Sequence, residues 1–347
     1  MILDDLSHTF VIAEAGSNWK CGTYNEDLEQ AKKLIKIASE AGADAVKFQT
    51  FRSSTIYAKD AGKSEYLSKL GIKDDINELF DYLSMPYEMI PELSNYCKQL
   101  DIEFMSSAFS VEDAKIIDPF VNVHKIASFE LNHVRLLEFL AKTNKPIILS
   151  TGASTYFEID FAVNLLKKHG NENFILMQCT SKYPCPIESL NLSVIPNLKS
   201  KYNCIMGFSD HSEDPIISPL LAIGYGVTLI EKHFTLDKNL KGPDHKVSLS
   251  PEELSIMIKS IRKADSSKGN GQKEILSVEK ELHNFACRSL QAIKPINKGD
   301  ILIEGENFEV LRPGIRKRGL DAKFLEKVIG KKSTKDISIG DGIVDYE

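Results

Sequence analysis

Between Phe10 and about Lys263, short apolar runs rich in valine and isoleucine alternate with segments of helical periodicity. This alternation is typical of repeated βα units built around a parallel sheet. The eight predicted strands are Phe10–Glu14, Ala45–Gln49, Glu103–Ser106, Val123–Ile126, Pro146–Ser150, Phe174–Cys179, Ile205–Phe208 and Thr228–His233. Eight such units predict an α/β fold of the (β/α)8 TIM-barrel class.

The clearest predicted helix is Asn25–Glu40, in which Asn25 caps the first turn and the apolar residues share one face. Further helices are predicted at Pro86–Leu100, Val111–Ile117, Val134–Thr143, Phe157–His169, Pro215–Tyr225 and Pro251–Lys263. The stretch from Phe51 to Met85 is long for one βα connection, so we expect a partly helical lid or interface element there.

The pattern changes after Lys268, where a Gly-Asn-Gly triplet interrupts the chain. We therefore predict a barrel domain at 1–268, a linker at 269–285 and a small domain at 286–347. Short strand-like runs and turns predict that this small domain is β-rich. It also contains a weak internal repeat, formed by the segments Ile296–Asp300 and Ile337–Asp341.

The charge balance is mildly acidic, with 43 Lys and Arg against 49 Asp and Glu, which argues against nucleic-acid binding. No segment approaches the roughly 18 apolar residues of a membrane span, and the N-terminus lacks the features of a secretory signal. We therefore expect a cytoplasmic protein without membrane association. The six cysteines are scattered and form no CxxC pair, which predicts reduced thiols rather than disulfides or a zinc site.

Polar residues recur where the predicted strands end, and functional groups of a parallel barrel gather at that face. Lys47 and Lys125 lie near the ends of the second and fourth strands. Because a buried lysine needs an anionic partner, these two, flanked by serines, predict a phosphate or carboxylate ligand rather than surface side chains. The other polar residues at these ends include Glu14, Gln49, Ser107, Ser128, Glu130, Ser150, Ser181, Ser209 and Glu231.

Two histidines, His211 and His233, are expected at the mouths of the adjacent strands seven and eight. Either one alone is more often an ordinary hydrogen-bonded residue, but their placement on neighbouring strands favours a shared divalent cation. Nitrogen and oxygen ligands suit Mn²⁺, Co²⁺ or Mg²⁺ better than a closed zinc site. The coordination shell could be completed by substrate oxygens or by Asp210, Glu231, Asp244 or His245.

Activating water or a hydroxyl requires a general base, and a glutamate near a metal ion and lysines can be tuned for that role. Glu14 and Glu130 are the candidates at the strand ends. The turn Lys241–His245 after strand eight presents a further carboxylate, that of Asp244, over the barrel mouth.

With these residues in place, the chain resembles the sialic acid synthase family, which includes N-acetylneuraminate, legionaminate and pseudaminate synthases. The resemblance covers essentially the whole length. It rests on the motifs Ile12–Asn18, Ala43–Thr50, His124–Glu130, Leu149–Gly152, Cys179–Pro184, Gly207–Ser212, Glu231–Thr235 and Gly242–His245.

The resemblance implies a metal-dependent transferase that joins phosphoenolpyruvate to an N-acylated hexosamine. His211 and His233 would hold the cation, with Mn²⁺ preferred over Mg²⁺ or Co²⁺, and Glu130 would position and deprotonate water. The residues expected to hold phosphoenolpyruvate are Lys47, Lys125, Ser128, Ser150 and Ser209. Those expected to contact the sugar are Glu14, Gln49, Tyr183, Asp244 and Arg312.

The tail resembles the antifreeze-like SAF domain, a β-clip fold that completes these enzymes. This resemblance implies a domain-swapped homodimer in which Arg312 of one protomer reaches the sugar site of its partner. The alternative interpretation of Arg312, with Arg316, Lys317 and Arg318 nearby, is a solvated basic loop.

Trp19, Ser107 and Ser181 depart from residues common in the family, and we expect them to line the sugar side of the site. These departures leave the acceptor open. We expect N-acetylmannosamine, which would give N-acetylneuraminate. The alternative is a 6-deoxy diamino-hexose, the acceptor type of the legionaminate and pseudaminate synthases.

Three other interpretations remain. A Schiff-base aldolase would use Lys125 as a covalent nucleophile and need no metal ion. A non-catalytic sugar-acid sensor would keep the barrel without the reaction. The tail alone, at 286–347, could also bind carbohydrate.

Overall fold

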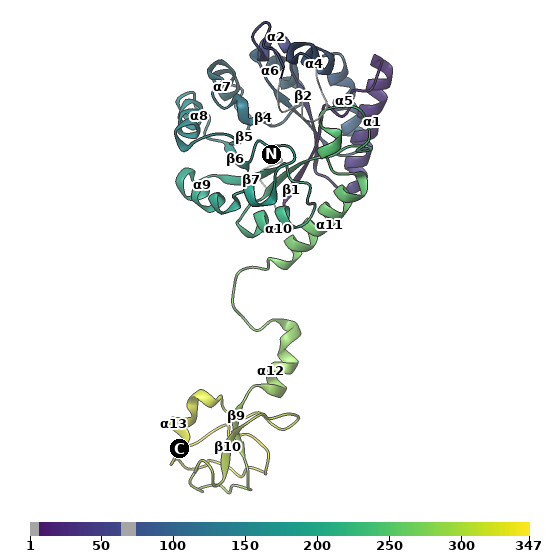
Figure 1. Cartoon of the computed structure of the whole chain (residues 1–347). Coiled ribbons are helices and arrows are strands. Elements are labelled where there is room, and N and C mark those ends of the chain that lie inside the picture. The colour runs from purple at the N-terminus through teal and green to yellow at the C-terminus, as the bar shows by residue number, and fades with distance from the viewer. Residues whose placement is uncertain (1–6, 64–73) are drawn as a thin grey trace. The chain divides into compact units, whose positions relative to one another are not determined.

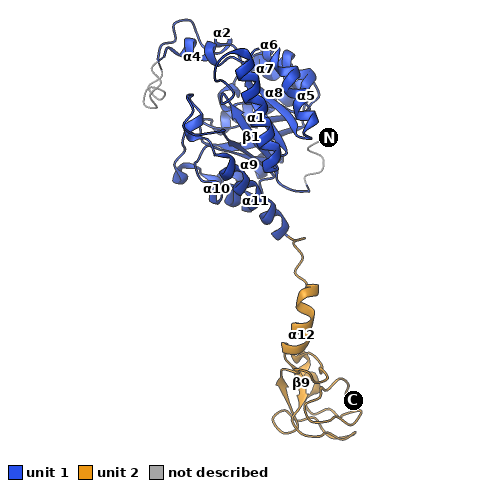
Figure 2. Cartoon of the chain, turned by 90° about the vertical axis from the view of Figure 1, so that its right-hand side faces the viewer, with its two compact units in different colours: residues 1–268 blue, residues 269–347 orange. Residues whose placement is uncertain are grey.

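The computed structural model describes residues 7–63 and 74–347. The chain divides into two compact units, the first ending at Lys268 and the second beginning at Gly269. Figure 2 shows the two units in blue and orange. Among the residues described, no helix combines the length and the apolar content that crossing a bilayer requires.

The first unit is a closed barrel of eight parallel strands in sequence order, in which β1 pairs with both β2 and β8 (Figure 1). The strands are β1 (Phe10–Gly16), β2 (Ala45–Thr50), β3 (Glu103–Ala108), β4 (His124–Ile126), β5 (Ile147–Ser150), β6 (Phe174–Cys179), β7 (Ile205–Asp210) and β8 (Leu229–His233). All eight lie where apolar runs predicted them, and the TIM-barrel prediction is confirmed.

Helices surround the barrel as an outer layer (Figure 1). The helices of the first unit are α1 (Tyr24–Ala41), α2 (Ser53–Ile56), α4 (Ile76–Leu83), α5 (Met89–Gln99), α6 (Val111–Ile117), α7 (Val134–Ala141), α8 (Tyr156–Lys168), α9 (Ile195–Tyr202), α10 (Ile217–Gly224) and α11 (Pro251–Ser267). Helix α9 was not predicted, because it is short and Pro196 stands at its second position. The long connection from Phe51 to Met85 contains α2 and α4, and part of it lies outside the described residues.

Helix α1 begins one residue earlier than its sequence pattern predicted. Its N-cap is Thr23, whose backbone N–H donates to the Glu26 carboxylate at 2.8 Å, so the prediction of Asn25 as the cap was wrong. The helix ends at Gly42, which adopts the left-handed conformation with φ 87°.

Side-chain alternation divides the barrel into two apolar layers. Residues that point outward pack against the helices and form the larger core. Residues that point inward fill the barrel with Phe10, Ile12, Ala45, Met105, Val123, Ile148, Ile175, Met177 and Leu229. Because successive strand residues face opposite sides, the next inward positions along each strand rise from this apolar plug toward the C-terminal face. Polar residues occupy those positions.

The second unit has its own small core. Strands β9 (Ser289–Ala292) and β10 (Phe308–Leu311) pair antiparallel, and α12 (Lys280–Ala286) and α13 (Leu325–Val328) belong to the same unit. The core residues are Leu290, Ala292, Ile296, Leu302, Phe308, Val328, Ile337 and Ile343. The two repeat segments pair with each other, since Ile296 and Ile337 exchange backbone hydrogen bonds of 2.9 and 2.8 Å.

Close backbone contacts in the second unit give a stability prediction. A Cβ atom at Gly319 would lie 2.1 Å from the carbonyl oxygen of Leu290, and backbone cannot move aside as a flexible side chain would. Gly319→Ala should therefore destabilise this unit by about 2 kcal/mol or more. Hydrogen exchange should show faster exchange at 289–343 and unchanged protection in the barrel.

The matched control is Ile315→Ala, because Ile315 lies in the same unit and is 95 % exposed. Equal exchange in the two variants would contradict the close packing at Gly319.

Candidate functional site

The C-terminal half of the barrel interior carries a layer of charged and hydroxyl side chains above the apolar plug. Pairing places Glu14 beside Lys47, Ser107 beside Lys125 and Ser209 beside Glu231 on neighbouring strands. These side chains all point inward because each stands two residues after an inward apolar position on its strand.

Lys47 is buried at the centre of this layer. Its Nζ lies 2.5 Å from Oε2 of Glu14 and 3.7 Å from Oε2 of Glu231, and it donates a hydrogen bond of 3.1 Å to Ser107 Oγ. Burial alone would lower the pKa of Lys47, but the two carboxylates outweigh burial and raise it. Lys47 is therefore a cation at neutral pH. Gln49 completes this side by donating to Glu14 Oε1 at 2.9 Å.

Lys125 is the second buried cation. It donates to Ser150 Oγ at 2.8 Å and lies 3.6 Å from Oε1 of Glu231, which also accepts a 3.0 Å hydrogen bond from Ser209. Burial lowers the pKa of Lys125, and Glu231 opposes this only in part. Burial would raise the pKa of Glu231, but Lys125 and Lys47 outweigh it and lower that pKa to about 2.

The structure gives Glu231 a larger part than the sequence did. It had been considered only as one possible metal ligand, yet its carboxylate lies between Lys47 and Lys125. The alternation of β8 contains the signal, because Leu229 and His233 flank Glu231 at inward positions while Lys232 faces outward.

The two predicted metal ligands come together. The ring centroids of His211 and His233 lie 5.7 Å apart, and the Tyr183 ring stacks on His211 at 4.0 Å. His211 Nδ1 donates to the Thr180 carbonyl at 2.9 Å, which makes Nε2 the acceptor nitrogen of the ring, with Cys179 Sγ 3.9 Å from it. Burial and the neighbouring His233 lower the pKa of His211 to about 3, so its ring is neutral.

His233 offers a second nitrogen, because its Nδ1 is buried without a hydrogen-bond partner among the described residues. Two imidazoles facing a polar barrel interior fit a divalent cation that takes its remaining ligands from substrate or water. Within residues 7–63 and 74–347, no set of three His, Cys, Asp or Glu side chains is spaced to hold a metal ion.

One of the suggested additional metal ligands was wrong. Asp210 follows Ser209 on β7 and so points outward, where it pairs with Lys232 at 2.7 Å and accepts a hydrogen bond from Ser218. His245, another suggested ligand, is bonded through Nδ1 to Thr235 Oγ1 at 2.6 Å.

Asp244 is held over the strand ends by Ser17. Its Oδ2 accepts hydrogen bonds from the Ser17 hydroxyl at 2.7 Å and from the Ser17 backbone at 3.1 Å. A Cβ atom at Gly16 would lie 2.8 Å from that oxygen and 3.3 Å from His233 Nδ1. The bare backbone of Gly16 thus lets the Asp244 loop approach the histidine pair.

Two predicted serines lie around another glycine. A Cβ atom at Gly152 would lie 2.3 Å from Ser181 Oγ and 2.9 Å from Ser128 Oγ, and the Gly152 N–H donates to Ser128 Oγ at 3.0 Å. Cys179 lies 3.0 Å from the same point and 3.7 Å from His211 Nδ1. These hydroxyls therefore lie between the Lys125 side of the barrel and the histidine pair.

The two remaining predicted site residues belong to other segments of the chain. Glu130 follows β4 in a short 3-10 turn, and burial without a charged partner among the described residues raises its pKa to about 7. Arg312 follows β10, is exposed and belongs to the second unit.

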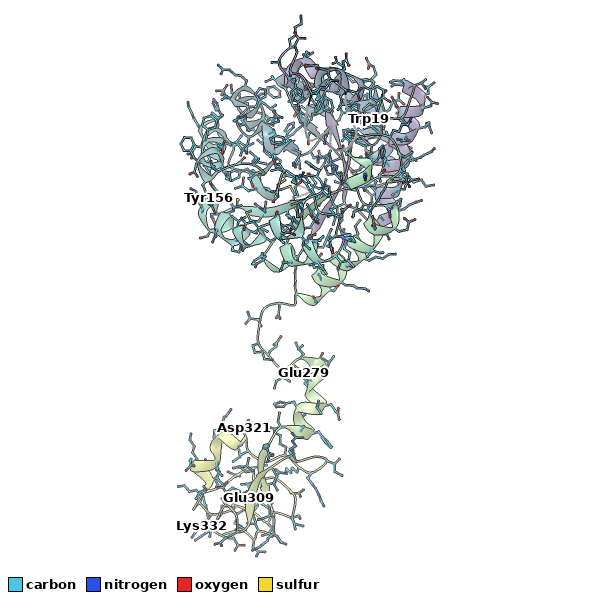
Figure 3. The ribbon with its side chains drawn as sticks, viewed as in Figure 1. Trp19, Tyr156, Glu279, Glu309, Asp321 and Lys332 are labelled. Carbon is cyan, nitrogen blue, oxygen red and sulfur yellow. The ribbon has the colours of Figure 1, made fainter. Side chains whose placement is uncertain are left out.

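The interpretation of one departure from the family pattern is corrected. Trp19, labelled in Figure 3, is 1 % exposed and packs in the outer core, so it does not line the barrel mouth. Ser107 accepts a hydrogen bond from Lys47, which also pairs with Glu14, an expected sugar contact. Ser181 lies near Cys179, which contacts His211.

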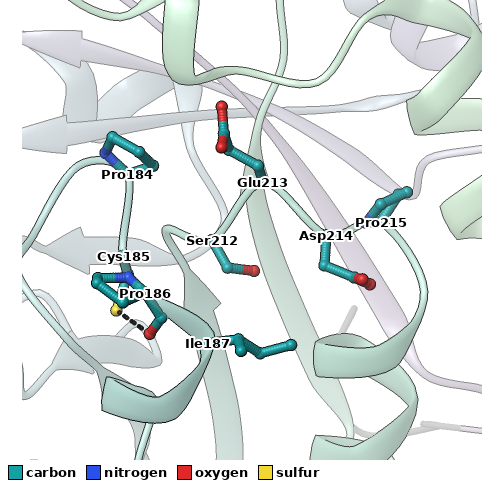
Figure 4. A pocket seen from close by; sticks show the side chains of 8 residues that line it. All are labelled: Pro184, Cys185, Pro186, Ile187, Ser212, Glu213, Asp214 and Pro215. Carbon is teal, nitrogen blue, oxygen red and sulfur yellow. Dashed lines mark hydrogen bonds between the residues drawn. The ribbon is translucent and has the colours of Figure 1, made fainter.

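A cavity of about 540 Å³ lies between the loops that follow β6 and β7 (Figure 4). Prolines, Cys185 and Ile187 form one wall, and Ser212, Glu213 and Asp214 form the other. Both loops also carry residues of the histidine cluster, because Pro184 follows Tyr183 and Ser212 follows His211. The cavity therefore adjoins the cluster but contains none of the predicted site residues.

Comparison with known proteins gives this arrangement a family. The model of the NeuB family matches residues 34–273. The chain belongs to the NeuB family. The spore coat polysaccharide biosynthesis protein SpsE of Bacillus subtilis is 39 % identical to it, over 96 % of this chain and 92 % of that protein. The N,N'-diacetyllegionaminic acid synthase of Campylobacter jejuni is 38 % identical, over 95 % and 97 %.

A solved structure shares the barrel of this NeuB family member. The N-acetylneuraminic acid synthetase of Leptospira borgpetersenii, crystallised with citrate, superposes with a TM-score of 0.68 at 32 % identity, covering 79 % of this chain and 90 % of that chain. Relatives of this family member are thus enzymes named for different sugar acids, and family membership leaves its acceptor open.

The environment of Glu130 gives a prediction that does not depend on activity. Its pKa is about 7 in the folded protein against 4.5 when exposed, so the unfolded chain releases a proton in this range that the folded protein retains. Stability therefore falls as the pH rises from about 4.5 to 7. The side chain introduced by Glu130→Gln cannot ionise. The free energy of unfolding of this variant, relative to that of wild type, should therefore rise by up to about 3 kcal/mol between pH 5 and pH 8.

Chemical unfolding of wild type and Glu130→Gln at pH 5 and at pH 8 measures this change in the free energy of unfolding. Glu188→Gln is the control, because Glu188 is exposed. A difference between wild type and Glu130→Gln that does not change with pH would contradict the raised pKa.

Proposed function

We propose that the protein condenses phosphoenolpyruvate with N-acetylmannosamine and water, giving N-acetylneuraminate and phosphate. The observation that supports this best is the pair of buried lysines beside serine hydroxyls, placed below the pair of histidines. A phosphate and a carboxylate need fixed cationic donors, and an aldehyde acceptor needs an electrophilic catalyst.

Each part of the site has a task in this reaction. Lys47, Lys125 and the neighbouring hydroxyls bind the phosphate and carboxylate of phosphoenolpyruvate through charge-assisted hydrogen bonds. A divalent cation, Mn²⁺ in preference to Mg²⁺ or Co²⁺, held by His211 and His233, supplies Lewis-acid polarisation of the acceptor aldehyde when bound.

The chain's own residues then control where carbon and water react. C3 of phosphoenolpyruvate adds to the aldehyde, water adds to C2 of the resulting oxocarbenium ion, and phosphate leaves by cleavage of its C–O bond. Glu130 is the proposed base that takes a proton from this water, because a pKa of about 7 lets it accept a proton near neutral pH. Gln49, Tyr183, Asp244 and Ser181 would contact the sugar.

The identity of the acceptor sugar is the most specific part of the proposal. N-acetylmannosamine is the first candidate on the sequence pattern, and the Leptospira synthetase named for N-acetylneuraminic acid supports it. A 6-deoxy diamino-hexose is the second candidate, because the Campylobacter relative is named for diacetyllegionaminic acid.

Phosphate release tests both candidates. Chelator-treated protein should release phosphate from phosphoenolpyruvate only when Mn²⁺ and an acceptor are both added. Turnover with N-acetylmannosamine would establish the first acceptor. Turnover with a diamino sugar alone would keep the reaction and replace the substrate.

Controls separate this reaction from its rivals. Lys125→Met should lose more than about 100-fold in rate, because it removes a cation that the phosphate or carboxylate needs. Full activity after chelation, with borohydride trapping of the sugar acid on Lys125, would instead establish a Schiff-base aldolase. Absence of release with every acceptor would favour a sensor.

The second unit supports a further part of the proposal. A compact β-rich unit of 79 residues at 269–347 agrees in size and position with an SAF domain. Arg312 is exposed on it, free to reach a sugar in the barrel of a partner protomer. We propose a domain-swapped homodimer in which Arg312 acts in trans.

Complementation tests the exchange of Arg312. Arg312→Ala and Lys125→Met should each be nearly inactive as pure homodimers. In a mixed dimer, one site would receive Lys125 from one protomer and Arg312 from the other, so unfolding and refolding the two variants together should restore part of the wild-type rate. No recovery, with mixed dimers present by mass spectrometry, would show that Arg312 acts in its own chain or not at all.

A further inference from the structure

The buried charges of the site compensate one another before any ligand binds. Lys47 and Lys125 supply two positive charges, and Glu14 and Glu231 supply two negative charges within 3.7 Å of them. Asp244 adds another carboxylate near the histidine pair. These five side chains together therefore carry no excess positive charge.

This charge balance disfavours binding of phosphoenolpyruvate, the substrate that the proposed function requires. Phosphoenolpyruvate has about three negative charges near neutral pH, two on the phosphate and one on the carboxylate. A buried site of low dielectric amplifies the energy of any uncompensated charge. Two lysines that are already paired cannot compensate a trianion unless a carboxylate is displaced or a cation enters with it.

Glu231 is the carboxylate that interacts with both lysines. Its two oxygens face the two lysines separately, Oε1 at 3.6 Å from Lys125 and Oε2 at 3.7 Å from Lys47. Oε2 is buried and accepts no hydrogen bond from a described residue, so no hydrogen-bond donor offsets its negative charge. Oε2 of Glu14 likewise makes no hydrogen bond to a described residue, but Glu14 pairs with Lys47 alone, at 2.5 Å, whereas Glu231 faces both lysines.

We propose that Glu231 prevents phosphoenolpyruvate from binding alone and makes its binding depend on a divalent cation. This inference rests on the proposed function. Glu231 is here a specificity-determining residue: it holds the lysines in place before substrate binds and repels a lone trianion. Because binding free energies are reciprocal, phosphoenolpyruvate must raise the affinity for the cation by the same factor.

Calorimetry on the full-length protein tests this inference. Chelator-treated wild type should bind phosphoenolpyruvate weakly, and Mn²⁺ should tighten its binding on the order of ten- to a hundredfold. Glu231→Gln keeps the shape and removes the charge, so without metal it should bind phosphoenolpyruvate on the order of tenfold more tightly than wild type. Inorganic phosphate should show a smaller gain because it carries less charge.

Three variants serve as controls. Glu231→Asp keeps the charge and should retain the dependence on Mn²⁺. Ser209→Ala removes the 3.0 Å hydrogen bond to Glu231 without changing charge, and because Ser209 is itself an expected phosphoenolpyruvate contact, this variant should weaken metal-free binding and not tighten it. Glu188→Gln removes an exposed charge elsewhere and should behave as wild type.

The outcomes separate this inference from the proposed function. Metal-free binding to Glu231→Gln that is equal to or weaker than that of wild type would overturn the inference. If Glu231→Gln does not fold, the wild-type protein still tests the inference. Its affinity for Mn²⁺, measured by electron paramagnetic resonance, must rise when phosphoenolpyruvate is added. Unchanged Mn²⁺ affinity would overturn the inference, whereas wild type that binds no phosphoenolpyruvate even with Mn²⁺ would refute the proposed function itself.

Discussion

Mutual compensation of buried charge is the constraint on which this barrel depends. Four ionised side chains lie inside a closed sheet, and an unpaired charge there would cost several kcal/mol. Glu14, Lys47, Lys125 and Glu231 come from four strands, so the barrel must close in one register for their charges to meet. The apolar plug below them excludes water from the other end, which strengthens each of these interactions.

Parallel-barrel geometry explains why so much of this arrangement can be predicted from the sequence. All eight strands are short apolar runs, and the residues at their ends converge whatever the details of packing. Lys47, Lys125, His211 and His233 were found in this way. Helix α9 was missed because a short segment with an early proline has little periodicity to detect.

The errors at the site concern the direction of side chains. Asp210 and Ser209 are neighbours in sequence, but only the exact phase of β7 decides which of them faces the interior. Trp19 follows a strand, and nothing in the sequence shows that it turns into the outer core. Glu231 was noted at a strand end, but its position between two lysines depends on the register of β8 against β7 and β1.

Strand β8 serves the site and the scaffold with alternate residues. Glu231 and His233 face the interior, while Lys232 between them pairs with Asp210 and donates to the backbone carbonyls of the loop after His211. A single-residue insertion or deletion in this strand would exchange the two sets at once. Diversification of substrate within such a barrel is therefore confined to the connecting loops, where length can vary without inverting a strand, and β8 itself can evolve only by replacing one side chain at a time.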